Sequence, residues 1–340
     1  MTPPSFGRYL AAIEAEMRRA VACEEPLLAR MMRYHLGWED AEGRPDSEGS
    51  GKALRPVLCL LTCEALCGSP DPALPAAAAI EILHNFSLVH DDIQDGDRTR
   101  RGRATAWAIW GIPQAINAGD GLWAVSTRTL LRAVERDGVS PEMVLRAMQM
   151  LNDASLTMIE GQALDIGFET QEHVTEDEYL DMIARKTGAL IARSISIGAV
   201  FGGASPEQLP AFERYGNLIG RIFQVRDDVL GIWGEEAVTG KSTTSDIRRK
   251  KQSLPIVYAL SRNIPAARDL AAIYALPELD HADVARAVSL LDETGARHHA
   301  DHLAETTFAA ATEALATLPL REDAKRELDE MGRFLLTRDR

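Results

Sequence analysis

Two pairs of adjacent aspartates, far apart in the chain, are the residues whose types and spacing are best suited to chemistry. They are Asp91-Asp92 and Asp227-Asp228, and each pair closes an apolar run of helical character. Carboxylates with cations beside them suit an oligophosphate held through magnesium, because Mg²⁺ prefers one or two carboxylates together with phosphate oxygens and water. The basic segments after the two pairs are Arg100-Arg101-Gly102-Arg103 and Lys241–Lys251.

A third aspartate extends the first pair. Asp91 and Asp95 are four residues apart, so on a helix they share one face. They would repel each other there unless a divalent cation joined them. The preceding run, Ala76–Val89, is mostly apolar, which places these carboxylates at the mouth of a buried region. The run before Asp227, Leu218–Phe223, is also largely apolar, so the sequence predicts two helices that face each other across a cavity.

Cations elsewhere in the chain could complete an anion site. The Arg100-Arg101 pair can grip a diphosphate bidentately. Lys52 and Arg55 are three residues apart at an expected helix start, where backbone N–H groups also favour anions. Taken singly, each cation is typical of an ordinary surface residue. Further point charges come from Lys186, Lys241 and Lys251.

The composition excludes some partners. The 340 residues carry a formal net charge of −14, with a pI near 5.1. This balance argues against nucleic acid as a partner, because phosphate backbones need a basic face. It also argues against an anionic membrane surface. An acidic enzyme can still bind a diphosphate where metal ions and a few placed cations reverse the local field.

The sequence predicts a cytoplasmic protein without a membrane span. The first residues carry no signal peptide, because no basic region precedes an apolar core. The most apolar segment, Gly188–Gly203, is interrupted by Arg193 and is too short and too polar to span a bilayer. Cys59, Cys63 and Cys67 recur every four residues without a CxxC spacing, which favours buried thiols in a reduced compartment.

Helical periodicity dominates the chain. Phe6, Tyr9, Leu10, Ile13 and Met17 follow a pattern that predicts one buried helix face. No run alternates apolar and polar residues long enough to predict a strand. We therefore expect an all-α protein of about a dozen helices, folded as a single domain over residues 1–340. Loops long enough to be functional lids or disordered are expected at Trp38–Ser50, Gly96–Thr105 and Gly234–Ser253.

The order and spacing of these motifs resemble the trans-isoprenyl diphosphate synthases, the head-to-tail polyprenyl synthetase family. The resemblance is specific because the motifs occur together, although each is common alone. They are Gly51-Lys52-Ala53-Leu54-Arg55-Pro56, Glu81-Ile82-Leu83-His84, Asp91-Asp92-Ile93-Gln94-Asp95, Arg100-Arg101-Gly102, Gly161-Gln162-Ala163-Leu164-Asp165, Lys186-Thr187-Gly188, Phe223-Gln224-Val225-Arg226-Asp227-Asp228, Thr239-Gly240-Lys241 and Ser253-Leu254-Pro255.

The resemblance implies an isoprenoid-synthase-type helical bundle around a central cavity, assembled as a homodimer. It implies a prenyltransferase that condenses isopentenyl diphosphate with an allylic diphosphate. The allylic C–O bond ionises, the C=C of isopentenyl diphosphate attacks the cation, and a proton leaves with the departed diphosphate as the expected base. Water would convert the cation into an alcohol, so the cavity must exclude it. Closure of Gly234–Ser253 over the site is the expected means.

The same resemblance implies three magnesium ions, with Mn²⁺ as an alternative metal. Asp91 and Asp95 would bind two ions from one side, with Asp92 in support. Asp227 would bind the third from the other side, with Asp228 close by. Metal ions and cations would stabilise the leaving diphosphate as charge develops on it.

Departures from the family pattern are few. Gly231 stands where the second motif usually has its last aspartate, which weakens the expected shell of the third ion. Ala53 replaces a usual basic residue and Ala104 a usual proline, and neither change removes an expected ligand.

Roles for the other polar residues also follow from the resemblance. The allylic diphosphate would be gripped by Arg100, Lys186 and Lys241. Isopentenyl diphosphate would be bound by Lys52, Arg55, His84 and Arg101. The residues expected beside the allylic cation are Thr187 and Gln224, those expected to support the direct ligands are Gln162 and Asp165, and Lys251 is expected to act in the closing segment.

The product length is expected to depend on the helix before the first motif. Phe86 lies five residues before Asp91, about 7–8 Å along a helix axis. A bulky aromatic there resembles the floor of short-chain synthases that make geranylgeranyl diphosphate, with farnesyl and longer products as alternatives. The alternative is that Phe86 is an ordinary core aromatic and the floor lies deeper, because aromatics at helical spacing usually pack in cores.

Two other functions compete with synthesis. A class I terpene cyclase would carry a motif of the form NDxxSxxxE, and Asn152-Asp153 with Glu160 comes close, but Leu156 stands where the hydroxyl should be. Fold alone cannot separate the two activities. A non-catalytic regulatory subunit usually loses the first aspartate motif, which is whole here.

Overall fold

The computed structural model describes residues 4–46, 53–171, 173–234 and 245–338. Two expected site residues, Lys52 and Lys241, lie outside these ranges, as do residues 235–244 of the expected closing segment Gly234–Ser253.

The described chain is helical almost throughout, which confirms the all-α fold class. Its helices are α1 (Pro4–Arg8), α2 (Leu10–Ala20), α3 (Pro26–His35), α4 (Leu54–Cys67), α5 (Leu74–Gln94), α6 (Ala106–Trp110), α7 (Ile112–Leu131), α8 (Pro141–Phe168), α9 (Glu176–Ile183), α10 (Ala189–Phe201), α11 (Leu209–Trp233), α13 (Ser245–Arg248), α14 (Leu254–Ser261), α15 (Pro265–Tyr274), α16 (His281–Thr294), α17 (Ala296–Ala316) and α18 (Glu322–Thr337). Shorter elements are the 3-10 turns η1 (Asp71–Ala73) and η2 (Arg132–Glu135), the π-helical turn η3 (Ala184–Gly188), and the strands β1 (Thr99–Arg100) and β2 (Arg103–Ala104).

The helices group into two compact units. Unit 1 comprises Met1–Ser155, Arg193–Glu213 and Pro319–Glu327. Unit 2 comprises Leu156–Ala192, Arg214–Leu318 and Leu328–Arg340. The organisation of residues 1–340 as one domain stays a prediction.

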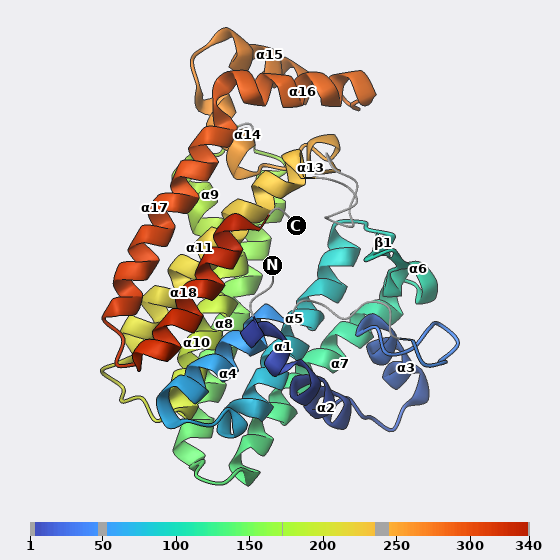
Figure 1. Cartoon of the computed structure of the whole chain (residues 1–340). Helices are drawn as coiled ribbons and strands as arrows, with labels where there is room; N and C mark the ends of the chain where they lie inside the picture. Colours follow the sequence, from blue (N-terminus) through green and yellow to red (C-terminus); the bar gives the residue numbers. More distant parts are fainter. Residues whose placement is uncertain (1–3, 47–52, 172, 235–244, 339–340) are drawn as a thin grey trace. The chain divides into compact units, whose positions relative to one another are not determined.

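Helix α5 is the centre of unit 1, and it lies alongside α7 (Figure 1). Small residues let the two backbones approach, because Ala76–Ala79 on α5 and Ala115 and Ala118 on α7 are completely buried. The Ser126 hydroxyl on α7 donates a hydrogen bond to the carbonyl of Ala79, at 2.7 Å. This packing fixes α5 along its length and therefore fixes the aspartates at its end.

The segment Asp71–Gln94, which contains α5, is long and apolar enough to cross a membrane by length and composition alone. Within the most apolar stretch of this segment, 72% is buried inside the protein. A helix in a protein core meets the same criterion, and packing against α4 and α7 accounts for the apolar character of α5.

Close packing against α4 requires a glycine in α10. A Cβ on Gly198 would lie 2.2 Å from the backbone oxygen of Cys59, a distance that side chains do not tolerate. Cys59 and Cys63 are buried as expected, whereas Cys67 at the end of α4 is exposed.

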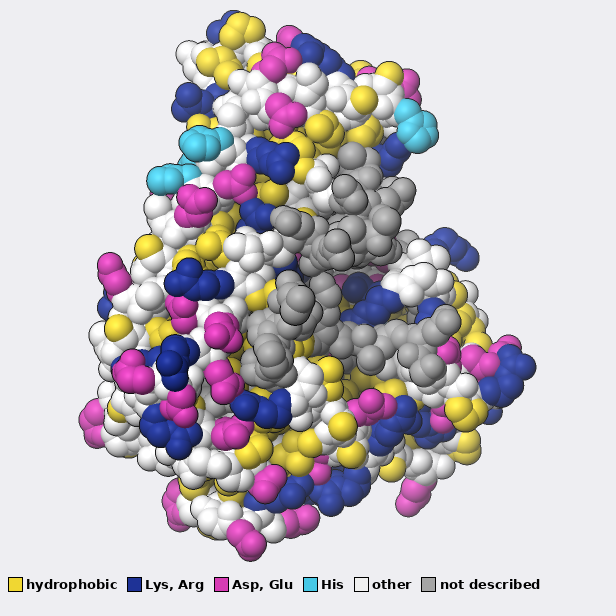
Figure 2. All heavy atoms as spheres, viewed as in Figure 1, with side chains coloured by type: hydrophobic (Ala, Val, Ile, Leu, Met, Phe, Trp, Pro, Cys, Tyr) yellow, Lys and Arg dark blue, Asp and Glu magenta, His cyan; other side chains and the backbone are white. Residues whose placement is uncertain are grey.

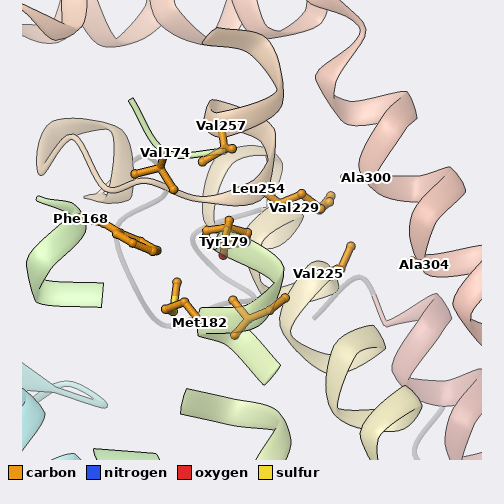
Figure 3. Packing of buried hydrophobic residues seen from close by; sticks show 11 residues of the cluster. Phe168, Val174, Tyr179, Met182, Val225, Val229, Leu254, Val257, Ala300 and Ala304 are labelled. Carbon is orange, nitrogen blue, oxygen red and sulfur yellow. The ribbon is translucent and has the colours of Figure 1, made fainter. Parts of the chain in front are cut away.

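Unit 2 has an apolar cluster that joins α8, α9, α11, α14 and α17. In Figure 3, Tyr179 of α9 lies among Met182 of its own helix, Val229 of α11 and Leu254 of α14. Ala300 of α17 belongs to the same cluster. These contacts fix α9, α11 and α14 against one another, and all three carry polar residues of the second aspartate motif or their partners.

Several local expectations can be compared with the described residues. The buried face of the first helices is confirmed for Phe6, Ile13 and Met17, but the prediction was wrong for Leu10, which is 38% exposed. The loop Gly96–Thr105 contains the antiparallel pair β1–β2, which is too short to produce a pattern in the sequence.

On the face shown in Figure 2, Lys and Arg side chains are mixed with Asp and Glu side chains. This mixture differs from the continuous basic face of nucleic-acid-binding proteins.

The substitution Gly198→Ala tests the contact between α10 and α4. The added methyl group should force the helices apart and lower the free energy of unfolding by about 1–3 kcal/mol. The matched control is Gly167→Ala in α8, where a Cβ would meet nothing within 4 Å, so better helix propensity should leave stability equal or higher. Urea denaturation followed by circular dichroism measures both changes. Equal stability of the two variants would contradict the assigned contact.

Candidate active site

Three carboxylates gather at the C-terminal end of α5. Asp91 and Asp92 lie in its last turn, and Asp95 is its C-cap residue. This end of a helix carries the equivalent of about half a negative charge, so three further negative charges are unfavourable there without cations. Asp92 is buried, with 2% exposure, whereas Asp95 is exposed. The structure thus concentrates negative charge where the helix itself repels it.

Arg100 partly neutralises this cluster. Its Nε donates a hydrogen bond to Oδ1 of Asp92, at 2.7 Å. Burial raises the pKa of Asp92 to about 6, the Arg100 guanidinium opposes that rise, and the nearby Asp91 and Asp95 charges reinforce it. The pair is therefore a charge-assisted contact inside the protein.

The β1–β2 hairpin presents Arg100 to Asp92. Its register pairs Thr99 with Ala104 and Arg100 with Arg103. The two turn residues, Arg101 and Gly102, have φ values of 52° and 76°, as a tight two-residue hairpin requires. The positive φ at the second turn position explains why a glycine follows the two arginines.

Arg103 fastens the hairpin to the preceding part of unit 1. Its guanidinium donates to the backbone oxygens of Tyr34, at 3.2 Å, and Glu39, at 2.7 Å. It also lies 4.2 Å from the centre of the Tyr34 ring, which is a cation–π contact. Arg103 therefore holds the hairpin in place, while Arg100 faces the carboxylates.

A cavity in unit 1 brings a histidine near these arginines. Its lining includes His35, Asp92, Arg100 and Arg101. Burial and the nearby guanidinium groups lower the pKa of His35 to about 3, so the imidazole is neutral at pH 7. Its buried Nε2 has no hydrogen-bond partner among the described residues. No sequence motif marks His35, and only its place in the fold does.

A second cavity of unit 1 lies beside Arg101 and is lined also by Glu81, Asn85 and Ala53. Burial raises the pKa of Glu81, and the charges of Arg55 and Arg101 oppose that rise. Burial lowers the pKa of His84 far below its usual value, and the same two arginines add to the effect. Three residues expected at the isopentenyl diphosphate subsite therefore occupy one charged region of unit 1.

In unit 2, Lys186 and Thr187 lie in the π-helical turn η3. Such turns often occur at functional sites because they redirect side chains from a helix. Lys186 Nζ donates to Oδ2 of Asp165 on α8, at 2.5 Å. A Cβ on Gly161 would lie 2.2 Å from the backbone nitrogen of Lys186, so the glycine of the Gly161–Asp165 motif allows α8 and η3 to meet.

A chain of hydrogen bonds links Thr187 to the second aspartate pair. The Thr187 hydroxyl donates to Oε1 of Gln224, at 2.7 Å, and Nε2 of Gln224 donates to Oδ1 of Asp228, at 2.9 Å. Oδ2 of Asp228 accepts from the Tyr179 hydroxyl, at 2.5 Å, and from the Leu254 backbone N–H, at 3.1 Å. Both carboxylate oxygens of Asp228 are therefore engaged inside the protein.

The environment of Asp228 differs from that of its neighbour. Burial raises the pKa of Asp228 to about 6, and the hydrogen bonds from Tyr179, Gln224 and Leu254 oppose that rise. Asp227 is 43% exposed and forms an ion pair with Arg338, just after α18. Neither Tyr179 nor Arg338 belongs to a motif, so sequence reasoning missed both.

The described carboxylates suit a divalent cation in charge and exposure. Among the described residues, no three His, Cys, Asp or Glu side chains already converge on one point. Asp91, Asp95 and Asp227 nevertheless offer hard oxygen ligands, and Mg²⁺ commonly takes one or two of these with phosphate and water. A cation would also relieve the repulsion at the end of α5. Taken unit by unit, Asp91 with Asp95 in unit 1 and Asp227 in unit 2 therefore each suit a metal held jointly with a phosphorylated substrate.

The expected site residues are thus placed in two sets. Unit 1 holds Arg55, His84, Phe86, Arg100 and Arg101 with the first aspartate motif, and unit 2 holds Gln162, Asp165, Lys186, Thr187, Gln224 and Lys251 with the second. The expectation that both aspartate pairs face one cavity stays a prediction.

Known proteins share this fold and these motifs. The sequence model of the family described as polyprenyl synthetase matches residues 47–291. A geranylgeranyl diphosphate synthase of Mycobacterium tuberculosis is 40% identical over 301 residues, which cover 88% of this chain and 84% of that protein. A (2E,6E)-farnesyl diphosphate synthase of the same species is 35% identical over 342 residues, covering 99% and 93%. The crystal structure of a polyprenyl synthetase from Streptomyces coelicolor A3(2) superposes with a TM-score of 0.90 at 37% identity, covering 97% and 98%.

An all-helical fold with two aspartate motifs and these relatives defines a prenyltransferase. The chain belongs to the polyprenyl synthetase family, as the resemblance of its motifs predicted.

The neutral state of His35 gives a pH dependence that can be measured. The pKa of His35 is about 3 in the folded protein and about 6.5 in an unfolded chain. The unfolded state therefore binds an extra proton between these values, so stability is complete above about pH 6.5 and falls as the pH is lowered. The substitution His35→Gln should remove up to about 1.4 kcal/mol per pH unit of this loss.

Urea denaturation at pH 7, 6 and 5 checks this expectation. The measured quantity is the difference in unfolding free energy between the variant and the unmodified protein at each pH. His302→Gln, at an exposed position of α17, is the comparison variant. Parallel pH profiles for His35→Gln and the unmodified protein would show that His35 titrates normally in the fold.

Proposed function

We propose that this protein condenses isopentenyl diphosphate with an allylic diphosphate in head-to-tail fashion. The observation that carries the proposal is the carboxylate cluster at the C-terminal end of α5, with Arg100 beside it on the β1–β2 hairpin. This arrangement leaves excess negative charge at one point of the surface, which cations would neutralise. The metal ions of a metal-bound diphosphate would supply that positive charge, and the diphosphate would place its own negative charges near Arg100 and Arg101.

Magnesium, or Mn²⁺ in its place, is the metal we propose, with three ions held by the two motifs. When bound, the metal would neutralise charge on the leaving diphosphate. Asp91, Asp95 and Asp227 are the proposed direct ligands, because they are the more exposed members of their motifs. Asp92 and Asp228 already accept hydrogen bonds from Arg100 and Tyr179, respectively. We therefore assign to them the role of holding the neighbouring ligands on α5 and α11 in place.

Residues of unit 1 would bind isopentenyl diphosphate. Arg55 and Arg101 supply permanent positive charge, and Lys52 is expected to join them. His84 is held neutral, so its imidazole N–H can donate a hydrogen bond to the diphosphate without adding charge. Buried Glu81 keeps this group of cations from repelling one another strongly when no substrate is bound.

Residues of unit 2 would act at the allylic end. Lys186 is oriented by Asp165 and would contact the leaving diphosphate, together with Lys241. The hydroxyl of Thr187 and the amide oxygen of Gln224 would present negative partial charge beside the developing cation. Their mutual hydrogen bond and the bond from Gln224 to Asp228 keep both side chains in place before the substrate binds.

The chain length of the product is proposed as C20. Phe86 of α5 is buried, with 8% exposure, and its ring meets His90 edge-on at 4.8 Å between centroids. A ring fixed in this way on α5, five residues before Asp91 in the last turn of the helix, can act as the floor for a growing chain. The named relatives include both a geranylgeranyl and a farnesyl diphosphate synthase, so C15 is the competing product.

We also propose a cytoplasmic homodimer. Helix α7 carries a line of exposed apolar side chains, at Ile112, Ile116, Trp123 and Leu131, with exposures from 41% to 52%. Successive positions in this set are separated by about one or two helical turns, so the four side chains lie on one face of the helix. An exposed apolar face of this kind on a soluble monomer is unfavourable and suits a second copy of the chain.

Terpene cyclisation is the weaker candidate on structural grounds. Asn152 and Glu160, the residues of the near-match to the cyclase motif, are exposed on α8 and are engaged elsewhere. Asn152 donates to the Met148 carbonyl of its own helix, and Glu160 pairs with Arg185. Leu156 between them is 60% exposed.

A product assay tests the proposal. Purified protein, Mg²⁺ and isopentenyl diphosphate are incubated in turn with dimethylallyl, geranyl and farnesyl diphosphate, and the dephosphorylated products are sized by chromatography with mass detection. We expect a discrete C20 alcohol. A cyclic hydrocarbon formed from an allylic substrate alone would replace the synthase assignment by a cyclase. Failure to elongate any primer would favour the regulatory-subunit alternative.

Asp91→Ala is the variant that tests the metal assignment in the same assay. Loss of a direct ligand should cut turnover by orders of magnitude, while the thermal unfolding midpoint changes little because Asp91 lies at a helix end. Asp97→Ala, also acidic and close in sequence, is the comparison. Near-normal turnover of Asp91→Ala would remove Asp91 from the metal site.

Phe86→Ala tests the floor of the cavity. Removal of the ring should lengthen the product beyond C20 by at least one five-carbon unit at unchanged primer preference. Phe168→Ala, which removes a buried ring of unit 2, controls for a general loosening of the protein. A product of unchanged length from Phe86→Ala would place the floor deeper along α5.

A further inference from the structure

A buried arginine outside every motif contacts the second aspartate pair. Arg338 follows α18, and its guanidinium forms an ion pair with Oδ1 of Asp227. The Arg338 side chain is 6% exposed, compared with 43% for Asp227. Both residues belong to unit 2.

Two further contacts fix the guanidinium. Its Nη2 donates to the backbone oxygen of Phe223, at 2.9 Å, one helical turn before Asp227. The guanidinium carbon lies 4.2 Å from the centre of the Phe223 ring, which is a cation–π contact. Arg338 is therefore held against α11 at two points that do not depend on Asp227.

A buried guanidinium is favourable only when a charge partner compensates for its lost hydration. Asp227 is that partner, and the contact uses one of its two carboxylate oxygens. A carboxylate held through one oxygen has a fixed rotamer and presents the other oxygen in a defined direction. Carboxylates that bind metals are commonly fixed in this way by a hydrogen bond to the oxygen that faces away from the metal.

We infer that Arg338 is a positioning residue for Asp227, holding Oδ1 so that Oδ2 is presented to a divalent cation bound with a diphosphate. The inference rests on the proposed role of Asp227 as a metal ligand. It assigns the residue that directly follows α18 a function at the second aspartate pair. It also gives a reason why the second motif can function with Gly231 in place of its last aspartate, because the remaining ligand is orientated in advance.

Metal binding by the full chain tests this inference without a turnover measurement. Mn²⁺ is titrated in the presence of saturating inorganic diphosphate, and free Mn²⁺ is counted by electron paramagnetic resonance. We expect Arg338→Gln to weaken Mn²⁺ binding by about tenfold or more, within the range usual for partners of metal ligands. Arg338→Lys should recover part of the loss, because it restores the charge without the planar fork.

The matched control is Arg333→Gln. Arg333 lies on α18, five residues earlier, and pairs with Asp329 at 2.7 Å on the surface. It should leave Mn²⁺ binding unchanged. Thermal unfolding of each variant shows whether the fold is retained, and if Arg338→Gln fails to fold, the comparison of Arg338→Lys with Arg333→Lys decides instead.

Asp227→Asn separates the failure of this inference from that of the proposed function. If Arg338 acts through Asp227, the double variant should bind Mn²⁺ no more weakly than Asp227→Asn alone. Unchanged or tighter binding by Arg338→Gln, with weaker binding by Asp227→Asn, overturns the positioning role and leaves the metal assignment standing. Unchanged binding by Asp227→Asn overturns the metal assignment of Asp227 itself.

Discussion

The repulsion among carboxylates at the end of α5 is the constraint on which the rest of unit 1 depends. Asp91, Asp92 and Asp95 add negative charge to the helix end that is already negative. Buried Asp92 can stay in place because the β1–β2 hairpin brings Arg100 to it, and Arg103 fastens that hairpin. Arg100 neutralises only part of this negative charge, and the remaining charge would attract metal ions. The same carboxylates therefore account for both the unfavourable local electrostatics and the proposed function.

In both aspartate pairs, the two residues differ in burial in the same way. In each pair the second residue is buried, with 2% exposure for Asp92 and 5% for Asp228, and is bonded to the chain. The first residue of each pair is more exposed. Neighbouring residues on a helix point about 100° apart, so they cannot both face the same ligand. A pair of adjacent aspartates therefore provides one anchor inside the protein and one carboxylate that is more exposed, which is the proposed ligand.

The sequence predicted the helical fold and the residue types of the site, because helical periodicity and motif spacing are local properties. It could not predict Tyr179, His35 or Arg338, since each acquires its role from a contact across the fold. Tyr179 reaches Asp228 over 49 positions of sequence, and Arg338 reaches Asp227 over 111. It also placed Asp228 among the metal-binding residues, and that role stays a prediction. The burial of Asp228 and the hydrogen bonds that it accepts are visible only in three dimensions.

The glycines of the motifs show how packing enables chemistry in unit 2. The π-helical turn at Lys186 departs from regular hydrogen bonding, and such turns persist only where surrounding contacts favour them. Gly161 lets α8 touch the backbone of this turn, and a Cβ on Gly220 would lie 2.7 Å from Cα of Gly188. These two close contacts flank Thr187 in sequence, and its hydroxyl donates to Gln224. Glycines that carry no functional group thus determine where the functional groups point.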